Sequence, residues 1–136
     1  MDETLAAWPD GIKKTRQRTV VLHVLRQSPR PLSAMEISAQ AEKLGQPLWL
    51  STVYRALEIF VEREVVVRIV LSGDLAVYEP KRPHHSHYAV CLGCRKTLRL
   101  EHCPMELHMP LLPDPDFQVL GHNLEIYGYC KDCRGL

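Results

Sequence analysis

The stretch "RPHHSHYAVCLGCRKT", residues 82–97, holds three histidines followed by two cysteines that are two residues apart. A second pair near the end of the 136-residue chain, in "CKDC", repeats this CxxC spacing. Two residues between thiolates let one turn direct both sulfurs to a common point. Two such turns supply a closed tetrahedral sulfur site, which is typical of structural zinc. We therefore expect one zinc ion to join the beginning of a small domain to its end. The predicted ligands are Cys91, Cys94, Cys130 and Cys133.

The alternatives for these cysteines are a redox motif or unpaired thiols. A redox CxxC usually occurs once, near a βαβ unit, and the sequence predicts no such unit. The acidic start "MDETLAAWPDG" lacks the basic region of a signal peptide, and no run of about 18 apolar residues predicts a membrane span. We therefore expect a cytoplasmic protein, in which disulfides are rare. Cys103 is left over, either as a small buried residue or as a ligand.

The histidines suggest a second metal site. His85 and His87 are two residues apart in a strand-like stretch, so their side chains share one face. Glu106 and His122 lie downstream and could complete a set of nitrogen and oxygen ligands. The alternative is that these are surface histidines, because spacing alone does not show that the four residues converge.

The first 80 residues predict three helices and a hairpin. The first helix follows Gly11 and has apolar residues at helical spacing. The second opens with Ser33 and Glu36, the pattern of a capping box, and the third is expected to have Ser51 as its N-cap. Two β-rich runs then flank a turn at residues 72–74. Three short helices followed by a hairpin indicate a winged helix-turn-helix domain.

Charge and motif position predict that this domain binds DNA. The net charge is only +1, yet residues 11–31 contain six basic residues and no acidic one. In a helix-turn-helix, the first turns of the second helix of the motif read bases, while basic residues elsewhere contact phosphates. The alternative is a core tyrosine and a solvated arginine in "STVYR". The predicted DNA contacts are Lys13, Lys14, Thr15, Arg16, Arg18, Ser51, Thr52, Tyr54 and Arg55.

The remainder of the chain predicts a small domain of strands with one interrupted helix. Residues 86–94 and 96–102 alternate like strands, and a helix is expected from Pro104. Three further prolines, at 110, 113 and 115, should cut or kink that helix. Residues 117–122 and 123–130 are strand-like again.

Taken together, these motifs resemble the ferric uptake regulator family from about Gly11 to Arg134. The segments that carry the resemblance are "TRQR" (15–18), "LSAMEI" (32–37), "STVYRALE" (51–58), "AVYEP" (76–80), "HHSHYAVCLGC" (84–94) and "GHNLEIYGYCKDC" (121–133). The resemblance implies an α+β protein, with a winged-helix DNA-binding domain over residues 1–80 and an α/β dimerisation domain over residues 84–136. A hinge is expected at about residues 80–84.

The resemblance also implies function. It predicts a homodimer that represses metal-homeostasis genes at a palindromic operator when its sensing metal is bound. It assigns the four paired cysteines to structural zinc. It assigns a second site in the dimerisation domain to His85, His87, Glu106 and His122. These ligands favour zinc or iron, and manganese or nickel would also suit them.

The chain departs from the family at a further, interdomain sensing site. Pro31, Ser86, Tyr88 and Arg99 stand where that site has ligands, and only Glu79 remains. We expect this site to be absent or rebuilt. The residues that could rebuild it around Glu79 are His84, His102 and Cys103.

Three other functions are alternatives. One is peroxide sensing within the same family, and another is a zinc-ribbon adaptor that binds proteins, which would leave the basic first helix without a role. The third is a metal-dependent hydrolase. No serine or cysteine nucleophile has a suitable partner, and a four-ligand site leaves no position for water. We therefore predict that the protein is not an enzyme, and that it has neither a small-molecule substrate nor a membrane partner.

Overall fold

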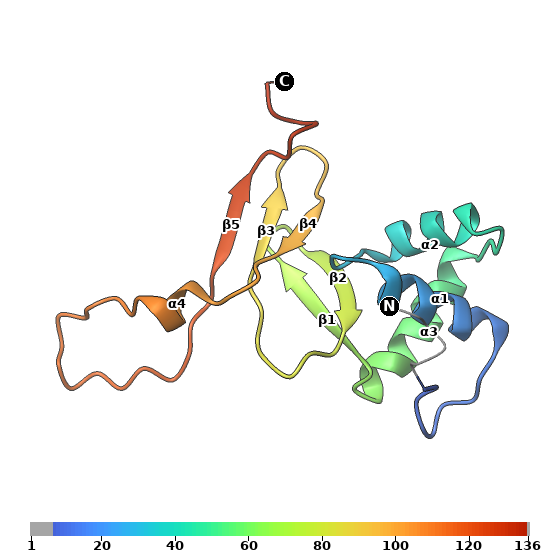
Figure 1. The fold of residues 1–136 in the computed structure, drawn as a ribbon, viewed down its shortest axis with the longest axis horizontal. Helices are drawn as coiled ribbons and strands as arrows, with labels where there is room; N and C mark the ends of the chain where they lie inside the picture. Colours follow the sequence, from blue (N-terminus) through green and yellow to red (C-terminus); the bar gives the residue numbers. More distant parts are fainter. Residues whose placement is uncertain (1–6, 136) are drawn as a thin grey trace. The chain divides into compact units, whose positions relative to one another are not determined.

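The computed structural model describes residues 7–135 and divides the chain into two compact units, one up to Arg82 and one from Pro83. Figure 1 shows helices in the first unit and a small sheet in the second. The division falls inside the segment that the sequence analysis assigns to a hinge. None of the helices within residues 7–135 has the length and apolar character needed to cross a membrane.

The first unit is a winged helix-turn-helix. Its three helices are α1 (Arg16–Gln27), α2 (Ala34–Lys43) and α3 (Leu50–Glu62). They are followed by an antiparallel hairpin of β1 (Val66–Leu71) and β2 (Leu75–Pro80), as predicted. Hydrogen bonds between the backbones of Leu32 and Tyr78, of 2.9 and 2.7 Å, attach the α1–α2 connection to the hairpin. Helices and wing therefore form one unit.

Apolar side chains at helical spacing form the core of this unit. Val21 on α1, Ile37 on α2, and Val53 and Phe60 on α3 are fully buried in one cluster. Trp8 packs edge-on against Phe60, with 6.1 Å between ring centroids. Burial of each large apolar side chain stabilises the fold by roughly 1.5–3 kcal/mol.

The helix ends follow local capping chemistry in two of three cases. Thr15 caps α1, and Ser33 with Glu36 forms the predicted capping box of α2. The prediction of Ser51 as the N-cap of α3 is wrong. The carbonyl of Trp49 already accepts hydrogen bonds from the amides of Thr52 and Val53, so α3 begins at Leu50 without a side-chain cap.

The second unit is a three-stranded sheet with β3 (Tyr88–Cys91) at its centre. Strand β4 (Thr97–Arg99) pairs antiparallel with β3, and β5 (Glu125–Gly128) pairs parallel with it on the other side. The short helix α4 (Pro104–Leu107) lies between β4 and β5 in the chain. Figure 1 shows a long loop leading from α4 back to β5.

The prolines shape this loop more strongly than its apolar residues do. Helix α4 ends after one turn, before Pro110, Pro113 and Pro115, which have no amide hydrogen to continue a helix or a strand ladder. The prediction of a strand at residues 117–122 is wrong, because all of residues 108–124 are described and none lies in a helix or strand.

The capping box of α2 makes the stability of the first unit depend on pH. Burial alone would raise the pKa of Glu36, but hydrogen bonds from Arg30 and Ser33 and the positive charge of Arg30 outweigh it and lower the pKa. A lowered pKa in the folded state stabilises the fold above the ordinary value of 4.5. That contribution disappears as pH falls through the folded-state pKa.

We therefore predict that Glu36→Gln destabilises the first unit at neutral pH and not in acid. Glutamine keeps the capping hydrogen bond and removes the charge, whose effect near a helix N-terminus is about 0.3–1 kcal/mol. Urea unfolding followed by tryptophan fluorescence measures this unit, since Trp8 and Trp49 both lie in it. The exposed Glu58→Gln is the control. A difference from wild type that persists well below pH 4.5 would contradict the assignment.

Candidate metal centres

Within residues 7–135, two groups of side chains are arranged to hold a metal ion, and both lie in the second unit. Each group contributes four ligand atoms that lie within 4.8 Å of one another. One group consists of cysteines alone, and the other combines histidines with a cysteine.

The four paired cysteines converge because β3 and β5 run parallel. Cys91 ends β3 opposite Gly128 of β5, and the amide of Leu92 donates to the carbonyl of Gly128 at 2.8 Å. Both CxxC turns therefore leave the sheet at the same edge. The Sγ atoms of Cys94 and Cys130 are 3.8 Å apart. A tetrahedral zinc ion with Zn–S bonds of about 2.3 Å has sulfur–sulfur edges of about 3.8 Å, so the cluster fits structural zinc.

The electrostatics of this cluster also favour a cation. Backbone amides of Cys130 and Cys94 donate to the sulfur of Cys91 and lower the pKa of this thiol to about 6. Hydrogen bonds to the neighbouring sulfurs of Cys130 and Cys91 raise the pKa of Cys133 to about 12. A bound cation would favour the thiolate form of all four sulfurs, as zinc does for the thiols that it binds.

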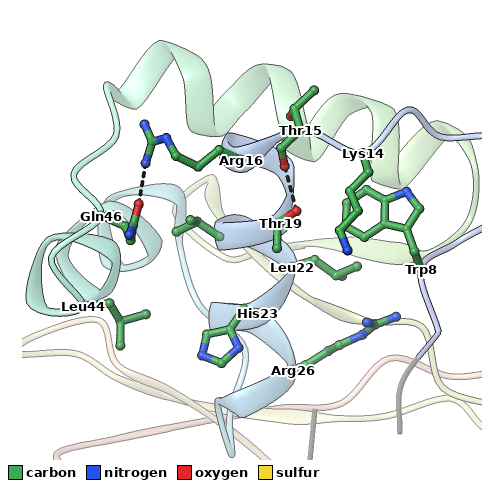
Figure 2. A pocket seen from close by; sticks show the side chains of 11 residues that line it. Trp8, Lys14, Thr15, Arg16, Thr19, Leu22, His23, Arg26, Leu44 and Gln46 are labelled. Carbon is green, nitrogen blue, oxygen red and sulfur yellow. Dashed lines mark hydrogen bonds between the residues drawn. The ribbon is translucent and has the colours of Figure 1, made fainter. Parts of the chain in front are cut away.

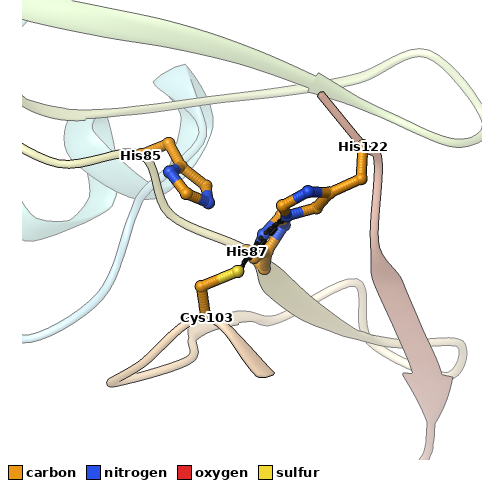
Figure 3. Close-up of side chains that lie close together, drawn as sticks. All are labelled: His85, His87, Cys103 and His122. Atoms are coloured by element: carbon orange, nitrogen blue, oxygen red, sulfur yellow. Dashed lines mark hydrogen bonds between the residues drawn. The ribbon is translucent and has the colours of Figure 1, made fainter. Parts of the chain in front are cut away.

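The second group contains His85, His87, Cys103 and His122. The two Nε2 atoms of His87 and His122 are 2.9 Å apart, and Cys103 Sγ lies 3.3 and 3.2 Å from them. The ring of His85 stands 5.0 Å from that of His87, measured between centroids. Figure 3 shows the three rings and the thiol pointing toward one another from separate segments.

Strand pairing also explains how this group assembles. His85 and His87 directly precede β3, and His122 precedes β5, so the parallel pairing places them at the edge of the sheet opposite the cysteine turns. The amide of Leu100 donates to the carbonyl of His87 at 2.8 Å, which holds the chain after β4 beside the histidines. Cys103 follows on that segment.

Burial and the neighbouring rings favour the neutral form of His87. Burial of the imidazole lowers its pKa first, and the positive charges that His122 and His85 can carry lower it further. A metal binds only the neutral imidazole. His87 is thus available as a ligand at lower pH than an exposed histidine.

The structure differs from the sequence analysis at the fourth position of this group. Glu106 was predicted there, but it is exposed within the single turn of α4, and its carboxylate is not among the converging atoms. Cys103 takes the position, because it is the buried residue just before that turn. Neither Glu79 nor His84 belongs to the group. Glu79 is buried in the first unit and accepts a hydrogen bond from Arg82 at 2.8 Å.

The predicted DNA contacts lie on α3 and around the start of α1, where Lys13, Lys14 and Thr15 precede the first helical residue. Figure 2 shows an open hollow along α1, where Lys14 lies near the ring of Trp8 and Arg16 reaches Gln46. Lys14, Arg16 and Arg26 line this hollow, and none of the described residues that line it is acidic. On α3, Tyr54 and Arg55 are exposed, whereas the residues that flank them are buried. The structure thus separates a basic face from the core.

Comparison with known proteins gives a consistent result. The model of the ferric uptake regulator family matches residues 9–127. The ferric uptake regulation protein of Campylobacter upsaliensis is 35% identical over 131 residues, covering 91% of this chain and 81% of that protein. The Vibrio cholerae ferric uptake regulator is 29% identical, with a TM-score of 0.69 over 88% of this chain and 93% of that chain. FurB of M. tuberculosis, described as a zinc uptake regulator, is 28% identical, with a TM-score of 0.50 over 92% and 98%.

A substitution at Gly93 tests the geometry of the cysteine cluster while all four cysteines stay in the sequence. A Cβ atom at this position would lie 2.8 Å from both Cβ and Sγ of Cys133. We therefore predict that Gly93→Ala displaces Cys133 and speeds the loss of zinc to a chelator.

Gly128→Ala is the matched control, because a Cβ there meets no atom within 4 Å. Zinc release can be followed with a metal-sensitive dye. Equal release rates in the two variants would contradict the close approach of the two CxxC turns.

Proposed function

Because this chain belongs to the ferric uptake regulator family, we propose that it represses metal-homeostasis genes by binding operator DNA as a homodimer when its histidine cluster holds a divalent metal. Members of this family are metal-responsive transcription regulators that bind DNA, and they are not enzymes. The sensing site, the metal and the DNA contacts are our proposals. Zinc and iron are the two metals that we favour, as the family names suggest.

The observation that carries the proposal is the presence of two metal-binding groups of different chemistry at opposite edges of one sheet. The cysteine group is closed and all-sulfur, as in sites that hold a protein together. The histidine group has two exposed members, His85 and His122, so a metal there can exchange with solvent. We assign structural zinc to the first group and metal sensing to the second.

The proposed mechanism is linkage between metal and dimer. A divalent cation would be held by the four donor groups of the histidine cluster. His87 and His122 would then be fixed relative to each other, together with the segments that precede β3 and β5. A ligand shifts an equilibrium only by binding one state better than another. In our proposal, the metal-bound arrangement is the one that fits two half-sites of a palindromic operator.

Exposed apolar side chains support a dimer formed by the second unit. Leu107, Leu111 and Leu120 are each at least 85% exposed, and Ile126 and Tyr127 of β5 are about half exposed. A monomer seldom leaves so many large apolar side chains in water, and such exposure marks interaction surfaces. A second copy of the chain is the partner that the family suggests.

For the DNA surface, we propose that α3 reads the operator and that the start of α1 contacts phosphates. Tyr54 and Arg55 are exposed in the first turns of α3, next to Ser51 and Thr52. Side chains at this position of a helix-turn-helix reach base edges in the major groove. The phosphate contacts would come from Lys13, Lys14, Thr15, Arg16 and Arg18.

We predict that Arg55→Ala and Tyr54→Ala weaken operator binding. A contact of Arg55 with a base edge would contribute roughly 1–3 kcal/mol at one operator position, whereas a phosphate contact would reduce the salt dependence of binding. Titration of labelled promoter DNA at several salt concentrations separates the two cases. Arg63→Ala removes the same charge at the far end of α3 and should have little effect. Unchanged binding in both variants would place the DNA surface elsewhere.

We also predict that His87→Ala abolishes the metal dependence of operator binding while the four-cysteine zinc is retained. His87 is the buried histidine of the cluster, so the substitution removes one of the four converging donor atoms. His84→Ala is the matched control, since His84 is exposed and outside the cluster. A mobility-shift assay with and without added zinc or iron(II) measures the effect. Loss of the metal response in His84→Ala, with His87→Ala unaffected, would assign sensing to another site.

A further inference from the structure

We propose that the thiolate of Cys103 is the fourth ligand of the histidine cluster, and that it makes this site selective for zinc over iron(II) and manganese(II). This inference rests on the proposed function and narrows the sensed metal to one. It concerns the position at which the structure departs from the set of three histidines and a glutamate that the family resemblance implies.

The first argument is geometric. In a tetrahedral zinc site with Zn–N bonds of about 2.0–2.1 Å and a Zn–S bond of about 2.3 Å, neighbouring nitrogens lie about 3.3 Å apart and each nitrogen lies about 3.6 Å from the sulfur. The observed separations are 2.9 Å between the Nε2 atoms of His87 and His122, and 3.3 and 3.2 Å from these atoms to Cys103 Sγ. Each is only a few tenths of an ångström shorter than the expected edge. A small outward movement of the side chains would therefore admit the ion.

The second argument is the placement of Cys103 in the chain. Its side chain is buried, at 7% exposure, next to His87 at 6%. The hydrogen bond from the amide of Leu100 to the carbonyl of His87 holds the segment that leads to Cys103. Helix α4 starts at Pro104, directly after Cys103. Cys103 is also the one cysteine of the chain outside the four-cysteine group. The backbone around Cys103 thus places its thiol beside the histidines, and the four-cysteine site does not use this thiol.

The third argument is ligand chemistry. Thiolates favour zinc and other soft or borderline metals, whereas carboxylates suit manganese and other hard cations. Imidazole and thiolate are both ligands that zinc binds, and four of them fill the tetrahedral coordination that zinc usually adopts. Manganese(II) and iron(II) also stand below zinc in the general order of affinity. A site with the Cys103 thiolate in place of a carboxylate ligand therefore has a stronger preference for zinc.

Cobalt(II) provides a direct test, because its spectrum reports thiolate ligands. The full-length protein is first loaded with one zinc per chain at the four cysteines, and one equivalent of cobalt is then added. We expect tetrahedral visible bands together with a near-ultraviolet thiolate-to-cobalt charge-transfer band. Zinc is monitored throughout to show that it does not leave the cysteine site. Visible bands without the charge-transfer band would overturn the proposal.

Two substitutions form the matched pair. Cys103→Ser should remove the charge-transfer band, and Glu106→Gln should leave it unchanged, because Glu106 is exposed and outside the group. The wild-type spectrum tests the proposal even if Cys103→Ser folds poorly. A band that persists in folded Cys103→Ser would place the thiolate elsewhere and overturn the proposal.

Metal competition measures the selectivity. Cys103→Asp replaces the soft ligand with a carboxylate, so the ratio of zinc to manganese affinity should fall. If Cys103 did not bind the metal and only contacted a histidine ligand, its substitution would change zinc affinity by about 10- to 100-fold. We expect the ratio of zinc to manganese affinity to fall by more than about 100-fold. An unchanged ratio would overturn the selectivity.

The failure of this inference can be told apart from failure of the proposed function. If operator binding requires a metal and His87 but the cobalt complex lacks the thiolate band, the function stands and the role of Cys103 is overturned. If the band is present but operator binding ignores every added metal, Cys103 is a ligand in a protein that does not sense through this site.

Discussion

The parallel pairing of β3 with β5 is the constraint on which both metal centres depend. Parallel strands bring like ends together, so the residues after the strands meet at one edge and those before them at the other. The cysteine turns follow the strands, and the histidines precede them. The register of Cys91 opposite Gly128 therefore sets the geometry of two sites at once. A slip of one residue would turn every side chain of β5 to the other face.

The two centres differ in how their donor groups are prepared for a cation. In the cysteine group, backbone amides lower the pKa of Cys91, so the fold itself favours a thiolate. In the histidine group, burial and the neighbouring rings lower the pKa of His87, whereas a backbone hydrogen bond at Leu124 raises it. A site organised by backbone turns assembles as the domain folds, which suits a structural ion. A site organised by side chains from three segments can open and close with little change in the sheet.

The sequence predicted features that depend on neighbouring residues better than those that depend on distant ones. The capping box at Ser33 and the CxxC spacings are local patterns, and the structure contains both the capping box and the cysteine cluster. The N-cap of α3 was predicted at Ser51, but hydrogen bonds to the carbonyl of Trp49 start the helix one residue earlier, at Leu50. The presence of Cys103 rather than Glu106 in the histidine group depends on where the chain turns after β4. Spacing along the sequence carries no information about that turn.

The prolines of the second unit connect its metal chemistry to its surface. They restrict α4 to one turn and leave residues 108–121 as a loop between α4 and His122. Bringing the ends of such a loop together costs conformational entropy, so a loop whose ends are not held samples many arrangements. A cation bound by Cys103 and His122 would hold both ends. Leu111 and Leu120, which the loop exposes to solvent, would then be presented in fewer arrangements. Metal binding would thus favour dimer contacts through the loop without moving the sheet.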